Sequence, residues 1–289
     1  MPAERNGVPY PAVAMVIIAI LSVQLGSALA TDLFDELGVG GVVFMRALVS
    51  AIVLMIIWRP NLRIRREDIP VTLMFGVALA GMNLAFYESI DRIPLGTAVT
   101  IEFIGPLSVA LITSHRRKDL IWVAMAATGI LLLTGGIGGD DLDVAGILLA
   151  VLAGILWGSY IVLGKRMGEQ YVGGQGLAIA MVVSTVLTLP FAFGGGLSDL
   201  AQPEVLGLIV FVGILSSAFP FSLEMEAMRR LPSNVFGVFM SLEPAIAAMI
   251  GFLVLDQGVA PRELVAIALV VTASAGALRS AGVPEPIDH

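Results

Sequence analysis

Two glutamates inside long apolar segments are the residues best suited to chemistry in this chain. Glu102 lies about eight residues into the segment 94–113, and Glu243 about eleven residues into the segment 232–255. At about 1.5 Å of rise per helical residue, both would lie near the middle of a hydrocarbon layer about 30 Å thick. A charge at that depth costs at least ~2.5 kcal/mol on insertion scales and by default marks a pathway or a site. We expect the two carboxylates to bind a cationic group or exchange a proton, with a buried structural hydrogen-bonded pair as the alternative.

Each of these glutamates is close to a proline. Pro106 leaves the carbonyl of Glu102 without its usual helical donor, and Pro244 directly follows Glu243. Proline has no N–H to offer the preceding turn, and unpaired backbone oxygens at mid-membrane can line a polar cavity. We predict helix breaks at Pro106 and Pro244, and a central space on which the two glutamates converge.

Arg46 lies about seven residues from the outer end of its segment, at a depth near that of Glu102. It could pair with a glutamate or hold the carboxylate of a substrate. A zwitterionic amino acid needs an anion for its ammonium and a donor for its carboxylate, which Glu102 or Glu243 and Arg46 could supply. Loss of water disfavours the charged form of a carboxylate, so one glutamate could alternate between a protonated and a substrate-bound state. That alternation would couple outward substrate movement to inward proton movement, with Glu102 and Glu243 as the proton-coupling residues.

Other polar and aromatic side chains reach similar depths on other segments. The candidate substrate-binding residues are Gln24, Arg46, Asn83, Tyr87, Glu102, Trp157, Tyr160, Glu224 and Glu243. Gln24 and Asn83 could equally hydrogen-bond to neighbouring helices, and Trp157 and Tyr160 could equally be packing residues. In the functional interpretation, polar groups from several segments face a common interior.

The elements that must position these residues are membrane helices. Hydrophobic residues make up 57% of the 289 residues and charged residues 13%, against about a quarter charged in soluble domains. A span needs about 20 mostly apolar residues. The first half contains such segments at 12–31, 39–58, 69–90, 94–113 and 120–136, and the second half at 145–163, 174–193, 205–228, 232–255 and 262–278. We predict an all-α integral membrane protein with ten transmembrane helices.

The two halves of the chain repeat one another. Glu88, Arg92, Pro94 and Pro106 recur, offset by about half the chain, as Glu226, Arg230, Pro232 and Pro244. Two related units in a chain this apolar are typical of transporters. Because five spans per half is an odd number, the second repeat must be inverted relative to the first, a geometry that supports alternating access. We predict repeats over residues 12–136 and 145–278, followed by a short cytoplasmic tail over 279–289.

The positive charges predict the orientation, because lysine and arginine in short loops stay on the cytoplasmic side. With the N-terminus inside, the cytoplasmic loops hold Arg5, Arg59, Arg63, Arg65, Arg66, Arg116, Arg117, Lys118, Lys165, Arg166, Arg229, Arg230 and Arg279. Of the loop cations, Arg92 and Arg262 alone fall on the other side, where the loops are acidic. Both termini are therefore predicted to be cytoplasmic, and the first apolar segment to be a retained span.

Several function classes are disfavoured. The chain has no cysteine, and its two histidines, His115 and His289, cannot supply a zinc cluster. The basic clusters 63–66 and 115–118 determine topology rather than bind nucleic acid, and the glycine runs lack the strand and helix of a phosphate loop. We expect a lipid bilayer as environment, with no metal, cofactor, nucleic acid or partner protein.

Short motifs in both halves resemble one known family. In the first half they are Gly81-Met82-Asn83, Phe86-Tyr87, Pro94-Leu95-Gly96, Glu102-Phe103 and Gly105-Pro106-Leu107. In the second half they are Ser222-Leu223-Glu224-Met225, Arg230-Leu231-Pro232, Phe236-Gly237 and Met240-Ser241-Leu242-Glu243-Pro244-Ala245. From about Val16 to Leu278 the chain resembles the EamA family of the drug/metabolite transporter superfamily, specifically its bacterial threonine/homoserine exporter branch.

The resemblance implies ten helices in two inverted repeats, a bacterial inner-membrane location, and export of small amino acids driven by the proton gradient. The further positions that match that branch are Gln24, Arg46, Trp157 and Tyr160. Glu88 and Glu226 depart from it, and an added carboxylate near each mouth could favour cationic substrates. Their spacing from Arg92 and Arg230 also suits ion pairs on the helix surface.

Two alternatives to amino-acid export stay open at this point. The first is an exporter of another polar metabolite, or of a cationic metabolite or drug, for which the two extra glutamates argue. The second is an intramembrane lipid-handling enzyme in which paired glutamates act as acid and base. The sequence lacks the nucleophile, metal cluster and loop domain that such an enzyme needs, so we expect no enzyme.

Overall fold

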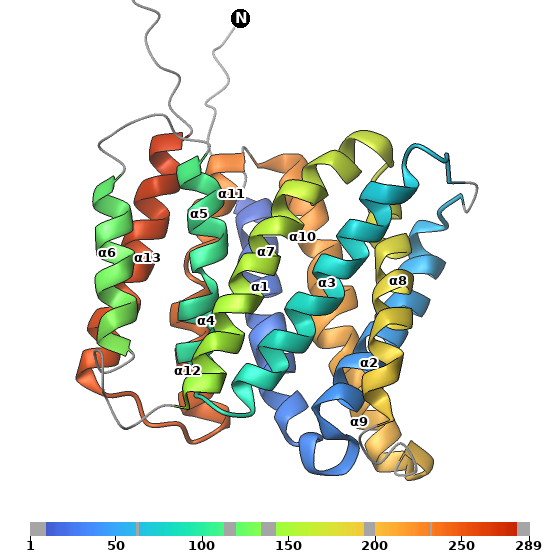
Figure 1. Cartoon of the computed structure of the whole chain (residues 1–289), viewed down its shortest axis with the longest axis horizontal. Helices are drawn as coiled ribbons and strands as arrows, with labels where there is room; N and C mark the ends of the chain where they lie inside the picture. The colour runs from blue at the N-terminus through green and yellow to red at the C-terminus, as the bar shows by residue number, and fades with distance from the viewer. Residues whose placement is uncertain are drawn as a thin grey trace, which may run out of the picture.

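The computed structural model describes residues 10–61, 64–112, 120–133, 143–193, 200–231 and 233–281. Within these ranges every regular element is helical (Figure 1). The first half contains α1 (Tyr10–Thr31), α2 (Phe34–Trp58), α3 (Ile69–Ile90), α4 (Leu95–Glu102), α5 (Ile104–Ile112) and α6 (Leu120–Leu133). The second half contains α7 (Val144–Gln170), α8 (Gln175–Ala192), α9 (Pro203–Gly213), the π-helical turn η3 (Ile214–Ala218), α10 (Phe219–Arg230), α11 (Ser233–Met240), α12 (Glu243–Val254) and α13 (Pro261–Ala281).

Some residues discussed above lie outside the described ranges. They are Arg5, Arg63, His115, Arg116, Arg117, Lys118, Pro232 and His289, together with residues 134–136 of the first predicted repeat and 282–289 of the predicted tail.

Several helices continue into one another. Phe103 alone separates α4 from α5, Ser241 and Leu242 separate α11 from α12, and η3 joins α9 to α10 without a gap. Counted over the described residues, the helices form ten rods, and each predicted segment overlaps one of them. Within the described part of the chain, six stretches are long and apolar enough to cross a membrane: Tyr10–Thr31, Phe34–Trp58, Ile69–Ile90, Val144–Gln170, Gln175–Ala192 and Pro203–Ala227.

The helix ends differ most from the predicted segments at two places. α7 continues to Gln170, beyond the predicted end at residue 163, because residues 164–170 are too polar for an apolar run yet still complete the helix. α2 begins at Phe34, and its regular part follows Gly38, whose φ of 67° and ψ of 157° interrupt the helix. Glycine adopts a positive φ of this kind without the steric cost that other residues have.

The break between α4 and α5 lies directly after Glu102, whose carbonyl cannot receive an N–H from Pro106. Here α7 comes into backbone contact. A Cβ on Gly105 would lie 2.0 Å from the Gly154 carbonyl oxygen, and a Cβ on Gly154 would lie 2.6 Å from the Glu102 carbonyl oxygen. In the second half, α12 starts at Glu243 with Pro244 in its first turn.

The π-helical turn η3 is a feature that the sequence did not predict. The Phe219 N–H donates to the Ile214 carbonyl, five residues earlier. Ser22 of α1 donates its hydroxyl to the Leu215 carbonyl, and Ser50 of α2 donates to the Gly213 carbonyl at 3.1 Å. Side chains of α1 and α2 therefore bind backbone oxygens in and beside this turn.

Rods of the first half of the chain pack against rods of the second half. α3 packs on α7, and α10 packs on α1. α2 packs on α8, α4 on α12 and α6 on α13, with the α6–α13 pair at one edge of the bundle (Figure 1). When the rods are numbered within each half, the third rod of either half packs on the first rod of the other half. The second, fourth and fifth rods pack on the rod of the same number.

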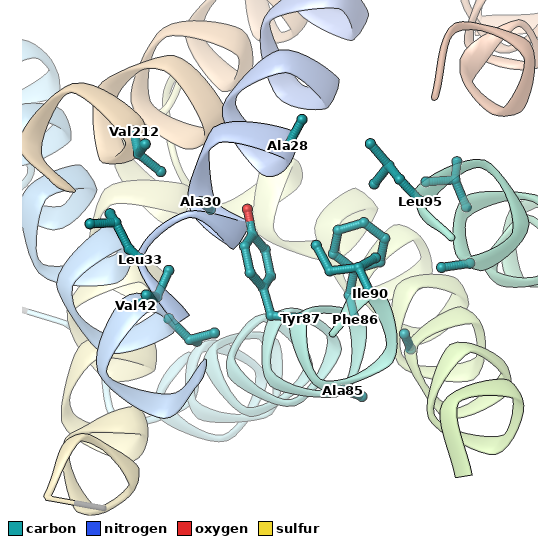
Figure 2. Close-up of a cluster of buried hydrophobic side chains, with 14 of the residues drawn as sticks. Ala28, Ala30, Leu33, Val42, Ala85, Phe86, Tyr87, Ile90, Leu95 and Val212 are labelled. Atoms are coloured by element: carbon teal, nitrogen blue, oxygen red, sulfur yellow. The ribbon is translucent and has the colours of Figure 1, made fainter. Parts of the chain in front are cut away.

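The largest buried hydrophobic cluster surrounds Tyr87, where α1 and α3 end and α2 begins. Tyr87 is 1% exposed, and its ring packs edge-on against Phe34 and Phe86, with centroids 6.2 and 5.4 Å away. Figure 2 shows its hydroxyl pointing toward α1, near Ala30. This cluster holds the buried Tyr87 ring in position.

Candidate functional site

A cavity of about 100 Å³ lies among the rods, beside both helix breaks. All nine candidate substrate-binding residues line it: Gln24 of α1, Arg46 of α2, Asn83 and Tyr87 of α3, Glu102 of α4, Trp157 and Tyr160 of α7, Glu224 of α10 and Glu243 of α12. The structure therefore brings the predicted residues together, and the role of each one stays a prediction.

Arg46 is 4% exposed and is held entirely by neutral groups. Its Nε donates to the Ser216 hydroxyl at 2.7 Å, and its Nη2 donates to the Ser217 hydroxyl at 2.9 Å and to the Ser216 carbonyl at 3.4 Å. Its Nη1 donates to Asn83 Oδ1 at 3.2 Å. Among the described residues no carboxylate forms an ion pair with Arg46. Of the two roles considered for Arg46, pairing with a glutamate is therefore absent from this structure, and binding a substrate carboxylate stays a prediction.

The face of Tyr87 gives the guanidinium its remaining neighbour. The Arg46 guanidinium carbon lies 4.2 Å from the Tyr87 ring centre, a distance at which an aromatic face attracts a cation. The Tyr87 and Ser27 hydroxyls share a hydrogen bond of 3.1 Å. The arginine is thus held in place while its charge is not neutralised, and a second N–H on Nη1 is left for an anion in the cavity.

Glu243 pairs with Gln24 rather than with a cation. The Gln24 amide nitrogen donates to Glu243 Oε1 at 3.0 Å, and the two residues are 1% and 8% exposed. The remaining polar atom of each side chain, Gln24 Oε1 and Glu243 Oε2, is buried without a hydrogen-bond partner. Buried polar atoms are paired in the large majority of cases, so this pair is chemically incomplete as it stands.

The two further carboxylates that line the cavity, Glu102 and Glu224, are half-buried. Within the described ranges, no group of three or more acidic or histidine side chains is placed to hold a metal ion. Among the described residues, the carboxylates are therefore spread around the cavity rather than gathered into a cation cage.

Both aromatic residues of α7 pack as well as line the cavity. Trp157 meets Phe103 edge-on, with ring centroids 5.2 Å apart, and Tyr160 stacks on Phe75 at 4.8 Å. The packing and binding interpretations of these residues are compatible, because each ring presents one surface to a neighbour and another to the cavity.

Sequence reasoning missed several lining residues. They are Val23, Ser27, Met82, Phe86, Ser216, Phe221 and Met240. The signal for Ser216 was the pair Ser216-Ser217 in the middle of an otherwise apolar span, since two adjacent hydroxyls at that depth need partners.

The two extra glutamates at the periphery form surface ion pairs, which confirms that part of the prediction. Glu88 lies 3.6 Å from Arg92, one helical turn away. Glu226 accepts a hydrogen bond of 2.8 Å from Arg230 Nε with the same spacing. Both carboxylates are therefore engaged away from the cavity.

Comparison with known proteins identifies relatives over almost the whole chain. The model of the EamA-like transporter family matches residues 144–279. The threonine/homoserine exporter RhtA of Escherichia coli strain K12 is 37% identical over 279 residues, which cover 96% of this chain and 94% of that protein. The threonine/homoserine exporter RhtA of Salmonella typhimurium strain SL1344 is 36% identical over the same shares.

More distant similarity extends to a transporter without a stated substrate and to a solved structure. The uncharacterized transporter YwfM of Bacillus subtilis strain 168 is 23% identical over 230 residues, 77% of each chain. A crystal structure of a protein 18% identical to this chain superposes with a TM-score of 0.67 and covers 93% of this chain and 97% of its own. At that identity the superposition concerns the fold alone.

Proposed function

This chain belongs to the EamA-like transporter family, and we propose that it exports threonine- or homoserine-like amino acids by alternating access in exchange for protons. Membership makes it a multi-pass membrane transporter rather than an enzyme. The similarity to two threonine/homoserine exporters over nearly the full length supports the substrate class.

The observation that carries the proposal is the state of Arg46. A buried guanidinium whose described partners are all neutral keeps a full positive charge facing a cavity. The carboxylate of a zwitterionic amino acid is the complement of that charge, and charge-assisted hydrogen bonds of this kind are about twice as strong as neutral ones. The carboxylates of Glu102, Glu224 and Glu243 line the same cavity and complement the ammonium.

We further propose two inverted five-helix repeats, over residues 12–136 and 145–278. The reciprocal packing, in which α3 contacts α7 and α10 contacts α1, supports this assignment. A helix break beside Pro106 in one half and beside Pro244 in the other also supports it. Two such units packed around one cavity allow it to open to either side of the membrane in turn.

The proposed location is the bacterial inner membrane, with both termini cytoplasmic. α2 ends, α3 begins and α7 ends on the side where α1 begins (Figure 1). Arg59, Arg65 and Arg66 lie in the connection on that side, and Lys165 and Arg166 lie in the last turns of α7. Positive charge gathered on one side supports a cytoplasmic assignment for it.

Proton exchange is assigned to Glu102 and Glu243, the two carboxylates beside the helix breaks. Export against a gradient needs an energy source, and a carboxylate that gives up its proton when substrate binds would couple export to the proton gradient. Glu88 and Glu226 support a cationic substrate less than the sequence suggested, since these two carboxylates pair with Arg92 and Arg230.

Transport by purified protein in liposomes tests the proposal. Vesicles loaded with labelled threonine should release it through the wild-type protein, and faster when the outside medium is acidic. Arg46→Gln should slow release at least about tenfold, because a charge-assisted contact contributes about 1.5–3 kcal/mol. Glu88→Gln, on the helix surface, is the matched control and should keep the wild-type rate. Folded wild-type protein that does not move threonine would refute the substrate class, and movement indifferent to pH would refute proton exchange.

A further inference from the structure

The incomplete pair formed by Gln24 and Glu243 indicates what the cavity is built to receive. Gln24 Oε1 and Glu243 Oε2 are buried acceptors without donors, although a 3.0 Å hydrogen bond joins the other atoms of the same two groups. An unpaired buried acceptor costs about 1–3 kcal/mol, and more when it is charged. A donor that reaches these two oxygens from the cavity would remove this cost.

A proton is the first candidate. A protonated Glu243 carries an O–H that can donate to the Gln24 amide oxygen, so two hydrogen bonds would join the side chains. The second candidate is the ammonium group of an amino acid. A primary ammonium has three N–H donors, so it can give one to Glu243 Oε2 and one to Gln24 Oε1 while compensating the negative charge.

These two ligands exclude each other. A proton on Glu243 removes the negative charge that attracts the ammonium, and it turns the oxygen that would accept an N–H into a donor. We propose that Gln24 and Glu243 form one two-oxygen site that takes either a proton or the primary ammonium of the substrate. This inference rests on the proposed function, and it places the coupling step at Glu243, with Gln24 as the residue that positions it.

The surroundings of Glu243 agree with this assignment. The titratable and charged groups that line the cavity with it are Arg46 of α2, Tyr87 of α3, Glu102 of α4, Tyr160 of α7 and Glu224 of α10. Arg46 is engaged by Ser216, Ser217 and Asn83. Of the cavity carboxylates, Glu243 alone has a fully buried oxygen without a partner among the described residues.

Calorimetric titration of the purified protein with threonine, in buffers of different ionisation enthalpy, counts the protons released on binding. At the acidic end of the accessible pH range, the wild-type protein should release about one proton per threonine, and its affinity should fall about tenfold per unit of decreasing pH. Glu243→Gln should abolish the release, and Glu88→Gln, in an ion pair on the helix surface, should retain it.

The outcomes separate the two proposals. Threonine binding without proton release in the wild-type protein overturns the shared site and leaves the substrate class standing. Proton release that persists in Glu243→Gln, or that is lost equally in Glu88→Gln, overturns the assignment to Glu243. Failure of folded wild-type protein to bind threonine overturns the proposed function and this inference together. The wild-type result decides even where a variant does not fold.

The role of Gln24 has its own readout, which a purely structural residue would not change. N,N-dimethylthreonine offers one N–H where threonine offers three, so the wild-type protein should bind it about tenfold more weakly or worse. Gln24→Met removes both amide atoms at similar length and should narrow the difference to about threefold. Ile18→Ala, on the exposed face of the same helix, should keep the wild-type ratio. An unchanged ratio in Gln24→Met would overturn the role of Gln24.

Discussion

The guanidinium of Arg46 lies over the face of Tyr87, 4.2 Å from the ring centre. This contact joins α2 to α3, and the hydrogen bond from Tyr87 to Ser27 extends it to α1. The cation of the site is therefore positioned by three rods of the first half and by the π-helical turn of the second. A change at any of these contacts should alter substrate binding more than it alters the fold.

Arg46→Lys should lose most of the substrate affinity although it keeps the charge. A lysine ammonium has three donors on a flexible stem and cannot reproduce the planar fork that meets Ser216, Ser217 and Asn83. We expect threonine affinity to fall about 10- to 100-fold, equivalent to about 1.5–3 kcal/mol, in a competition assay. Arg92→Lys, which changes an exposed ion pair, is the control. Wild-type affinity in Arg46→Lys would show that charge alone suffices.

Tyr87→Phe and Tyr87→Leu should separate the hydroxyl from the ring. Phenylalanine keeps the aromatic face beneath Arg46 and loses only the bond to Ser27, which contributes about 0.5–1.5 kcal/mol of stability. Leucine also removes the cation–π contact and the edge-on packing against Phe34 and Phe86. Transport should fall a few-fold at most in the first variant and at least about tenfold in the second. Equal losses in both would assign the role to the hydroxyl instead.

Gly105→Ala should destabilise the protein by about 3 kcal/mol or more, since its Cβ would lie 2.0 Å from a backbone oxygen of α7 and overpacking against backbone cannot relax. Gly168→Ala on α7 is the matched control, because a Cβ there meets no atom within 4 Å. Because alanine favours the helix more than glycine does, Gly168→Ala should stabilise the protein by about 0.5–1 kcal/mol. Thermal unfolding in detergent should order the midpoints as Gly168→Ala, wild type and Gly105→Ala, from highest to lowest.

Ser216→Ala should weaken substrate binding by leaving the Nε of Arg46 without its acceptor. We expect about a tenfold loss of threonine affinity, since an unpaired buried donor costs about 1–3 kcal/mol. Ser222→Ala changes a hydroxyl that bonds to the Ala218 carbonyl in the same rod and should stay within about threefold of wild type. Comparable losses in both variants would point to helix destabilisation rather than to the arginine.

Glu88→Gln and Glu226→Gln should leave substrate preference unchanged. Each breaks an ion pair at a partly exposed surface, where such pairs contribute about 1 kcal/mol or less. The ratio of threonine transport to inhibition by lysine or other cationic amino acids is the measurement. A marked drop in inhibition by cationic compounds would return the cationic-substrate alternative to consideration.

The central convergence could be predicted from the sequence. Glu102 and Glu243 sit at similar depth beside prolines in two related halves, and any packing of those halves about a shared axis brings them to one space. Gln24, Asn83 and Trp157 followed from their depth in the spans and from the family resemblance. All of these residues line the cavity.

The partners of Arg46 could not be predicted in the same way. The Ser216 carbonyl becomes available where the helix widens into a π-helical turn, and no periodicity of side chains reveals such a turn. The Gln24–Glu243 bond joins residues 219 positions apart. Its existence depends on how α1 approaches α12, which a depth estimate does not contain.

The π-helical turn has a consequence for everything that follows it along the rod. Relative to an uninterrupted α-helix, one extra residue is accommodated in η3, and each residue corresponds to about 100° of rotation about the axis. The rotational phase of α10 about the helix axis is therefore offset from that of α9. This offset determines which side chains of α10 face the cavity. Phe221 and Glu224 line the cavity in this phase. Deleting one residue between Ile214 and Ala218 would restore regular winding and leave both residues in their present phase. Regular α-helical winding of the unshortened segment would instead turn both residues away from the cavity by about 100°.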